Sequence, residues 1–382
     1  MQESILLDQP REVDVVSIER ELARLWKTAT EEGGDGEGAP VVRACSLNLV
    51  VVTADPSRLA AIEQLVGDVT LEHPARIFLI QVDRKATSPL LDAWISTRCS
   101  LPVPGGKQVC CEQITLSARG PEVSKVPSVV DSLLVPDIPT ILLWKADVTA
   151  DDQVLLTLAD MADRVLIDSS EDSDSLRLLR SMRTYVGSRR PGGLYGDLAW
   201  SHATAWRSAV AHAFGPGDVR KYLSEISSVD IVYSISNDPP HSGISQALLL
   251  LGWLSSRLGW SVLQPAQRGH ADSLTAVFGR GDNTIGATVT RRQVTTPRGP
   301  GGLEEVCLRL SGEAELRLFV GDERSSICTR LTINTGPARE SILWVHDRDE
   351  ASVVARELEV LDRDELYESA SEVLAILLRS TV

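Results

Sequence analysis

Two histidines stand beside the most distinctive parts of the sequence and are the first candidates for acid–base chemistry. His73 lies in the segment EHPAR, and His202 lies in the segment DLAWSH. A histidine can act as a general base near neutral pH, but it needs a positioned partner for the proton it moves. The sequence contains no nucleophile elbow, no Walker phosphate loop and no HExxH helix. We interpret both histidines as surface or core residues and predict no catalytic residue.

Acidic side chains gather in one short stretch, where they could coordinate a divalent cation. The stretch carries five carboxylates, at Asp163, Asp168, Glu171, Asp172 and Asp174. Aspartates also favour the amino termini of helices, because their carboxylates accept hydrogen bonds from free backbone N–H groups. We interpret the stretch as a strand end followed by a helix start, and predict no metal site.

The cysteines show no metal-binding pattern, since there is no CxxC pair and no histidine at a metal-ligand spacing. The six cysteines are Cys45, Cys99, Cys110, Cys111, Cys307 and Cys328. We expect buried, reduced thiols. Cys110 and Cys111 are adjacent, and on a strand they would point to opposite faces, so we do not expect them to bridge each other.

Arginines concentrate in one glycine-rich segment of this acidic protein. The segment RRQVTTPRGPGG contains Arg291, Arg292 and Arg298. Loops carry function disproportionately, and arginine forks bind phosphates and carboxylates. The segment is either a solvated loop or a partner-binding loop, and the sequence leaves both open.

Tryptophans mark a second candidate for partner binding. Trp206, Val210 and Phe214 follow one another at four-residue spacing, which predicts the buried face of a helix. Trp200 precedes that helix, so we expect it outside the helix and able to line a surface site. The candidate partner-binding residues of this motif are Asp197, Trp200, His202 and Arg207.

The amino-terminal part of the chain predicts a helix, a linker and an α/β domain. Apolar residues at three- and four-residue spacing from Val15 to Ala29 indicate an opening helix, and EEGGDGEGAP (Glu31 to Pro40) is typical of a flexible acidic linker. No strand precedes this run, so it is not a dinucleotide loop, and we predict no cofactor. Six strand-like runs follow: Ser46–Thr53, Arg76–Val82, Trp94–Ser100, Val109–Ser117, Thr140–Trp144 and Arg164–Ile167. With helical patterns between some of them, residues 41–170 form the predicted N-terminal α/β domain.

The remainder predicts a second α/β domain, residues 171–382, with a largely antiparallel sheet. The segment SRRPGG (Ser188 to Gly193) ends the preceding helical pattern and marks the predicted domain junction. The segment Ile244–Leu258 is apolar nearly all round, as a core helix would be. Strand-like runs occur at Asp230–Ser236, Leu274–Phe278, Thr284–Thr290, Val306–Leu310, Glu315–Val320, Ile327–Ile333 and Ser341–Val345. The predicted fold class is therefore α/β, with α+β character in the second half and two mixed-sheet domains flanked by helices.

The net charge and the hydropathy of the chain limit the classes of partner that it can bind. The chain has 382 residues with 38 Lys and Arg against 53 Asp and Glu, a formal net charge of −15. That charge repels a phosphate backbone, so we predict neither nucleic-acid nor membrane binding. Its apolar runs fall short of the ~20 residues that span a bilayer, and the amino terminus has no secretory pattern. We expect a cytoplasmic protein.

Several phrases, in this order, resemble one known family. They are SLNLVVVTAD, LEHPARIFLIQVD, VCCEQITL, PDIPTILLW, ADRVLIDS, GDLAWSHATAWRSAVAHAF and LLLGWLSSRLGW, from Ser46 to Trp260. Together they resemble the OpcA family of glucose-6-phosphate dehydrogenase assembly proteins. Asp197, Leu198, Trp200, Trp206 and Arg207 match a family motif. The segment His202 to Ala205 departs from its usual arginine-leucine-threonine-proline stretch.

The resemblance implies a non-catalytic assembly factor and allosteric activator in the oxidative pentose phosphate pathway. Such a protein binds glucose-6-phosphate dehydrogenase and favours its active oligomer, which shifts a population without performing chemistry. The alternative is a sugar-phosphate- or nucleotide-binding protein that uses the crevice between the two domains. A scaffold with no effect on activity is a third hypothesis, which only the kinetics of the partner enzyme would separate from the first.

Overall fold

The chain divides into two compact units that are not contiguous in sequence. The computed structural model describes residues 5–6, 10–34, 41–100, 108–187, 194–237, 240–294, 302–321, 326–345, 349–360 and 362–380. Unit 1 comprises residues 1–167, 189–195 and 350–362. Unit 2 comprises residues 168–188, 196–349 and 363–382. The sequence predicted a division near residue 170, and the structure adds two short returns of the chain to unit 1.

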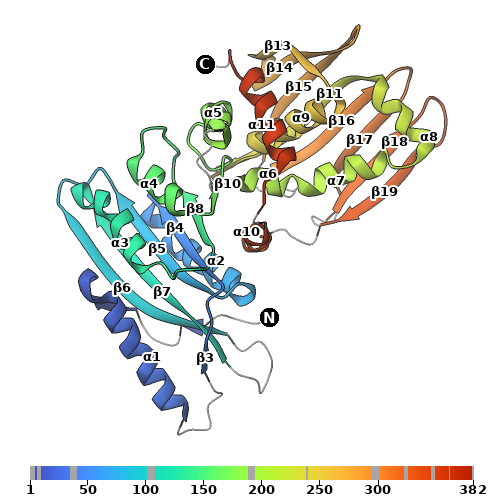
Figure 1. Cartoon of the computed structure of the whole chain (residues 1–382). Coiled ribbons are helices and arrows are strands. Elements are labelled where there is room, and N and C mark those ends of the chain that lie inside the picture. The colour runs from blue at the N-terminus through green and yellow to red at the C-terminus, as the bar shows by residue number, and fades with distance from the viewer. Residues whose placement is uncertain are drawn as a thin grey trace. The chain divides into compact units, whose positions relative to one another are not determined.

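Unit 1 is built on a mixed sheet whose centre is parallel (Figure 1). Its order is β1-β6-β7-β5-β4-β8-β9-β10, with β2 on β6 and β3 on β7. The parallel strands are β7 (Gln108–Arg119), β5 (Ala75–Asp83), β4 (Leu47–Thr53), β8 (Thr140–Lys145) and β9 (Arg164–Ile167), and β10 is Leu194–Asp197. All seven residues of β4 are buried, which explains its unbroken apolar run. The remaining strands are β1 (Ile5–Leu6), β2 (Arg11–Val13), β3 (Val41–Arg43) and the antiparallel β6 (Leu90–Ser100).

Helices cover the unit 1 sheet in two separate pairs. The helix α2 (Leu59–Glu72) packs with α10 (Glu350–Glu359), and α3 (Val126–Leu133) packs with α4 (Gln153–Met161). The opening helix α1 (Ile18–Gly34) docks on β6 and β3. Because α1 extends to Gly34, the predicted linker is helical over its first four residues, and residues 35–40 lie outside the described part of the chain.

Unit 2 holds a nine-stranded sheet of order β13-β14-β15-β11-β16-β17-β18-β19, with β12 on β11. Every pair except the parallel β11–β15 is antiparallel. The strands are β11 (Ile226–Asn237), β12 (Pro240–Ser242), β13 (Ser261–Arg268), β14 (Ser273–Arg280), β15 (Asn283–Gln293), β16 (Leu303–Leu310), β17 (Glu315–Val320), β18 (Ser326–Thr332) and β19 (Arg339–Trp344). The prediction of an α/β fold with two mixed sheets flanked by helices is confirmed.

The core helix of unit 2 is α9 (Ile244–Leu258), which packs against α11 (Glu365–Leu377), α5 (Ser175–Gly187) and α6 (Leu198–His202). A Cβ at Gly252 would lie 2.8 Å from the carbonyl oxygen of Ala370, so α9 and α11 can approach this closely only with glycine there. The helix α7 (Thr204–Ala213) packs on β17 and β18, and α8 (Gly217–Arg220) follows it. Within the described residues, no helix combines the length and apolar character needed to cross a membrane.

The cysteines correct one expectation. Cys99 on β6 and Cys110 on β7 are register partners and form a disulfide, with 4.0 Å between their Cα atoms. The prediction of reduced thiols is therefore wrong for this pair. The neighbouring Cys111 is a free, buried thiol, and burial raises its pKa to about 11. Cys110 and Cys111 do not bridge each other, as their positions on a strand predicted.

Candidate functional site

The tryptophan motif begins with a buried carboxylate at the start of α6. Asp197 is fully buried, and its Oδ1 accepts hydrogen bonds from the backbone N–H groups of Ala199 at 2.9 Å and Ser169 at 3.1 Å. It therefore caps α6 and ties it to the segment after β9. Burial, only partly offset by these hydrogen bonds, raises the pKa of Asp197 to about 7.

Trp200 lies inside α6 and is buried, which corrects the expectation that it lies outside a helix and lines a surface. Only 4% of the residue is exposed. Its Nε1–H donates to Asp364 Oδ2 at 2.7 Å, and its ring lies 5.7 Å from that of Tyr367 in a tilted arrangement. The local reason is that Asp197, rather than a residue nearer Trp206, starts the helix. Trp200 thereby faces the carboxyl-terminal helix α11.

Arg207 also contacts the Trp200 ring. Its guanidinium carbon lies 3.4 Å from the ring centre, in cation–π stacking distance. Its Nη1 donates to the Trp200 carbonyl at 2.6 Å and its Nη2 donates to Thr204 Oγ1 at 2.9 Å. Arg207 and His202 are half-buried. They are the two side chains of the motif that remain accessible to a partner.

The structure also shows where two other candidate residues lie, Trp206 and His73. Trp206 is fully buried in α7, so its assignment to the core is confirmed. His73, the other candidate base, is in unit 1, with its Nε2 4.0 Å from Glu359 Oε1. The two candidate histidines therefore belong to different units.

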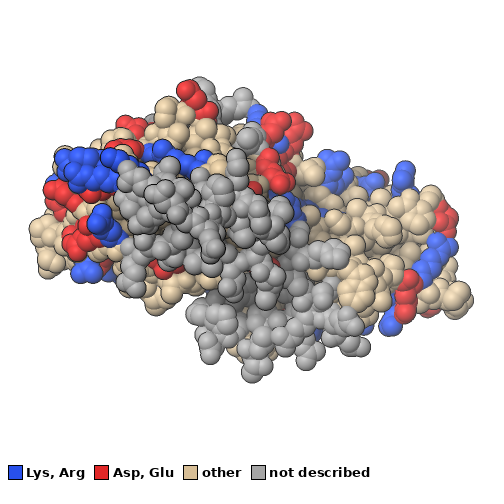
Figure 2. All heavy atoms as spheres, turned by 90° about the horizontal axis from the view of Figure 1, so that it is seen from below, with Lys and Arg blue, Asp and Glu red and all other residues tan. Residues whose placement is uncertain are grey.

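The arginines of the glycine-rich segment are partly engaged by acids of unit 2. Arg291 and Arg292 lie at the end of β15, where Arg291 Nη2 is 2.6 Å from Asp272 Oδ2 and Arg292 Nη2 is 4.0 Å from Glu305 Oε2. Both side chains stay about half exposed. Arg298 lies outside the described residues. On the face that Figure 2 draws, basic and acidic side chains of the described residues lie interspersed.

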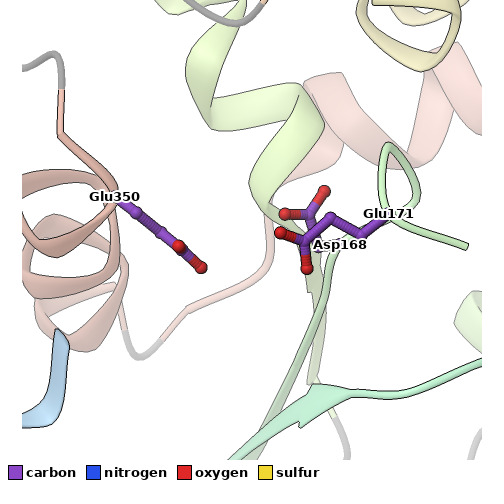
Figure 3. A group of neighbouring side chains, drawn as sticks. All are labelled: Asp168, Glu171 and Glu350. Atoms are coloured by element: carbon purple, nitrogen blue, oxygen red, sulfur yellow. The ribbon is translucent and has the colours of Figure 1, made fainter. Parts of the chain in front are cut away.

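The acidic stretch is organised as turns and caps. Asp168 Oδ1 accepts from the N–H and hydroxyl groups of Ser170, and Asp174 Oδ1 accepts from the Arg177 N–H at the start of α5. Figure 3 shows the neighbouring Asp168 and Glu171 carboxylates, whose oxygens lie within 4.8 Å of each other. Glu350, also drawn there, belongs to unit 1, where it pairs with the buried Lys145. Hydrogen bonds and caps thus account for Asp168 and Asp174, as the sequence indicated.

A pocket of about 860 Å³ in unit 1 was not anticipated from the sequence. It lies at the carboxyl ends of the parallel strands β4, β5, β7 and β8. Its walls include Ala54, Val82–Lys85 and parts of Gly120–Ser124 and Ala146–Val154. The available signal was the charged residues at the ends of two buried strands, DRK from the last residue of β5 and KAD from the last residue of β8, because carboxyl ends of parallel strands meet at one edge.

The turn that joins the parallel strand β4 to α2 is closed by its own carboxylate. Asp55 Oδ1 accepts from the backbone N–H of Ser57 at 2.9 Å and from its hydroxyl at 2.7 Å, and Pro56 has no N–H to offer. These hydrogen bonds hold the pKa of Asp55 below its usual range, so the group stays negative. A nucleotide diphosphate would need free N–H groups at this position.

Comparison with known proteins matches two family models to successive parts of the chain. The model of the glucose-6-phosphate dehydrogenase subunit N-terminal domain matches residues 66–184, and that of the C-terminal domain matches residues 194–371. The chain belongs to the OpcA family. The resemblance seen in the sequence phrases is thereby confirmed.

Curated relatives come from cyanobacteria and carry the name OxPP cycle protein OpcA. The protein of Synechococcus elongatus is 28% identical over 330 residues, which cover 81% of this chain and 69% of that protein. The Nostoc punctiforme protein is 30% identical over 208 residues, 52% of this chain and 40% of its own length. The Synechocystis protein is 31% identical over 153 residues, 40% of this chain and 30% of its own length. The chain thus spans less than half of the last two relatives.

Solved structures with a similar course of the chain include an NAD binding oxidoreductase from Klebsiella pneumoniae. It is 11% identical, with a TM-score of 0.47, over 87% of this chain and 96% of that one. The myo-inositol dehydrogenase of Lactobacillus casei is 12% identical, with a TM-score of 0.43, over 88% and 93% of the two chains. Similarity this distant says nothing about what the present chain does.

Proposed function

We propose that this chain is a non-catalytic assembly factor and allosteric activator of glucose-6-phosphate dehydrogenase. The observation that carries the proposal is the pair of family matches, which cover residues 66–184 and 194–371 and whose descriptions name a subunit of that enzyme. The names of the curated relatives support a role in the OxPP cycle. We place the site of this action, as part of the proposal, in the cytoplasm, where the chain would meet the enzyme.

The turn between β4 and α2 supports a role without dehydrogenase chemistry of its own. In a doubly wound sheet the diphosphate of a dinucleotide sits on free N–H groups at that turn. Here the Asp55 carboxylate takes the Ser57 N–H, and Pro56 follows it. A negative group already bound to the N–H disfavours a phosphate at the same place. The activity that the chain changes is therefore its partner's.

Activation follows if the chain binds the active oligomer of the enzyme more tightly than the inactive form. Differential affinity alone shifts such an equilibrium, and a ratio of about ten between the two affinities corresponds to about 1.4 kcal/mol. The proposed contacts on this chain are three arginines of unit 2 that are at least partly exposed, Arg207, Arg291 and Arg292, together with His202 and, from the sequence alone, Arg298. Asp197 and Trp200 act through position, because they hold α6 and the guanidinium of Arg207 in place.

A co-sedimentation experiment tests the proposal. The full chain and glucose-6-phosphate dehydrogenase from the same organism are mixed, and sedimentation velocity measures complex formation and the oligomer of the enzyme. We expect a stable complex and a larger share of the active oligomer. The combined variant Arg291→Ala with Arg292→Ala should weaken binding about tenfold. Arg339→Ala is the matched control, because Arg339 is an exposed arginine of the same unit that pairs with Asp218 at 2.7 Å.

Two results would speak against it. If the two proteins sediment independently at saturating concentration, the chain does not assemble with this enzyme. If Arg339→Ala weakens the complex as much as the double variant does, the arginines contribute only general charge and the proposed contact surface is wrong.

A further inference from the structure

The pocket of unit 1 lies where open parallel sheets bind ligands. The chain runs from β4 outward to β5 and β7 on one side, then crosses back to β8 on the other side of β4. The carboxyl ends of strands at such a switch point leave a crevice, because the connecting loops diverge there. A volume of about 860 Å³ is within the range of small-molecule sites. The position and size therefore indicate a ligand site inside one unit.

An acidic side chain ends the second parallel strand. Asp83 is the last residue of β5 and lines the pocket. Its Oδ1 accepts from the backbone N–H groups of Lys85 at 3.0 Å and Ala86 at 3.1 Å, which fixes the carboxylate while its second oxygen keeps its acceptor capacity. A carboxylate at this strand end binds the vicinal hydroxyls of a sugar in dinucleotide-binding sheets.

Two cations, Arg84 and Lys85, follow Asp83 and line the pocket together with the carboxylates of Asp147, Asp151 and Asp152. Arg84 Nη2 lies 2.7 Å from Asp152 Oδ2, and its guanidinium carbon lies 5.8 Å from the centre of the Trp144 ring, so this side chain is pre-positioned. Lys85 is exposed and forms no ion pair with the described residues. Asp152 balances the charge of Arg84, so the unpaired ammonium of Lys85 and the remaining N–H donors of the fixed guanidinium are the groups offered to a phosphate monoester.

The turn at Gly120 keeps this arrangement in place. Gly120 follows β7 with φ +55°, and a Cβ there would lie 2.8 Å from the carbonyl oxygen of Ala86. Only glycine allows the two loops to approach this closely in that backbone conformation. The loop that carries Asp83, Arg84 and Lys85 is thus supported by a second wall of the same pocket.

We propose that this pocket binds a small phosphorylated polyol, with its vicinal hydroxyls on Asp83 and its monoester phosphate on Arg84 and Lys85. The ligand is a monophosphate because Asp55 occupies the turn on which a diphosphate would rest. Both a sugar phosphate and a nucleoside monophosphate have this chemistry. The site goes beyond the proposed action on the dehydrogenase and does not depend on it, since it lies within unit 1 alone.

Calorimetric titration of the full chain tests the site directly. The probes are glucose 6-phosphate, ribose 5-phosphate, AMP, ribose, inorganic phosphate and NAD⁺. We expect at least one phosphorylated polyol to bind about tenfold more tightly than ribose and inorganic phosphate. Tight binding of the sugar phosphates alone identifies a sugar-phosphate site, whereas tight binding of AMP alone identifies a mononucleotide site.

Substitutions in the pocket separate binding of the phosphate from binding of the hydroxyls. Lys85→Ala should weaken the phosphorylated probe about tenfold and leave ribose unchanged, and Asp83→Asn should weaken every polyol while sparing inorganic phosphate. Lys125→Ala is the control, because Lys125 is an exposed lysine of the same unit outside the pocket. Both pocket residues are exposed, so circular dichroism should show wild-type folding.

Three outcomes would overturn the inference. The first is that no phosphorylated polyol binds at millimolar concentration. The second is binding that Lys85→Ala leaves unchanged or that Lys125→Ala weakens equally. The third is NAD⁺ binding as tightly as the monophosphates, which would contradict the role given to Asp55. Each result leaves the proposed complex with the dehydrogenase untouched, because that complex is measured without these ligands.

Discussion

Trp200 illustrates how one side chain joins three helices of unit 2. It projects from α6, donates to Asp364 at the cap of α11 and stacks under Arg207 of α7. Two contacts use the side chain, through its Nε1–H and its ring face, and Arg207 also donates to the backbone carbonyl of Trp200. Its removal would therefore loosen the packing of all three helices at once.

We predict that Trp200→Ala lowers the free energy of unfolding by about 3–5 kcal/mol, as deletion of buried aromatic side chains does. Trp344→Ala is the matched control, since Trp344 on β19 is 50% exposed and its loss should change stability by only about 0.5 kcal/mol. Urea denaturation followed by circular dichroism measures both. Equal losses for the two variants would mean that Trp200 is not the packing residue described.

Asp197 should make stability depend on pH. Its pKa is raised from its ordinary range to about 7, chiefly by burial. Between about pH 4, where the unfolded carboxyl ionises, and pH 7, the folded state holds a proton that the unfolded state has lost. Folding stability from this group is therefore present below pH 4 and falls as pH rises to 7. We expect Asp197→Asn to flatten that part of the profile. A wild-type slope that persists in the variant would assign it to other groups.

At the scale of elements, α1 is held to the sheet by a buried network of charges. Glu112 on β7 is 3% exposed and pairs with Arg76 Nη2 of β5 at 2.6 Å, while Trp26 of α1 donates to the same carboxylate. Arg76 Nη1 also reaches Glu19 of α1 at 2.6 Å. A buried pair of this kind is costly to break because the remaining partner stays desolvated.

We expect Glu112→Gln to lower the free energy of unfolding by about 3–5 kcal/mol, the usual cost of leaving one buried charge without its partner. The surface pair of Arg330 and Glu340, 2.7 Å apart but at least half exposed, supplies the control. Glu340→Gln should cost at most about 1 kcal/mol. The network would be unimportant for α1 if both substitutions had the same small effect.

The bridge between β6 and β7 gives another prediction at this scale. Cys110→Ser should lower stability by about 2–4 kcal/mol without reductant, because the cross-link restricts the unfolded chain. In dithiothreitol, wild type and variant should unfold alike. Cys328→Ser, which removes a free thiol, is the control. Unfolding of the wild type that is indifferent to reductant would show that the bridge does not form in solution.

Local patterns were sufficient for most elements and insufficient for those made by distant contacts. Glu315–Val320 and Ile244–Leu258 match β17 and α9, because alternation and an all-round apolar surface are visible in the residues themselves. The edge strand β13 was missed, since its mixed, mostly exposed residues follow no period. Trp200 was misplaced because Asp197, which accepts from the Ala199 N–H, starts a helix earlier than the apolar spacing around Trp206 indicated.

At the scale of the whole molecule, the division into two units depends on contacts between residues far apart in sequence. The helix α10 belongs to unit 1 because Glu350 pairs with Lys145, and Glu357 pairs with Arg164. Its sequence is amphipathic and gives no indication of which sheet it covers. The pocket of unit 1 was missed for a related reason, since it needs the order of four strands, which the sequence does not contain.

The activation of glucose-6-phosphate dehydrogenase is the central claim, and steady-state kinetics test it most directly. The enzyme from the same organism is assayed with increasing amounts of this chain, once sedimentation has shown that the two proteins bind. Preferential binding of the active oligomer predicts a saturable fall in the apparent KM for glucose 6-phosphate or a saturable rise in kcat. Unchanged kinetics with the chain demonstrably bound and saturating would contradict the claim and leave only a scaffold.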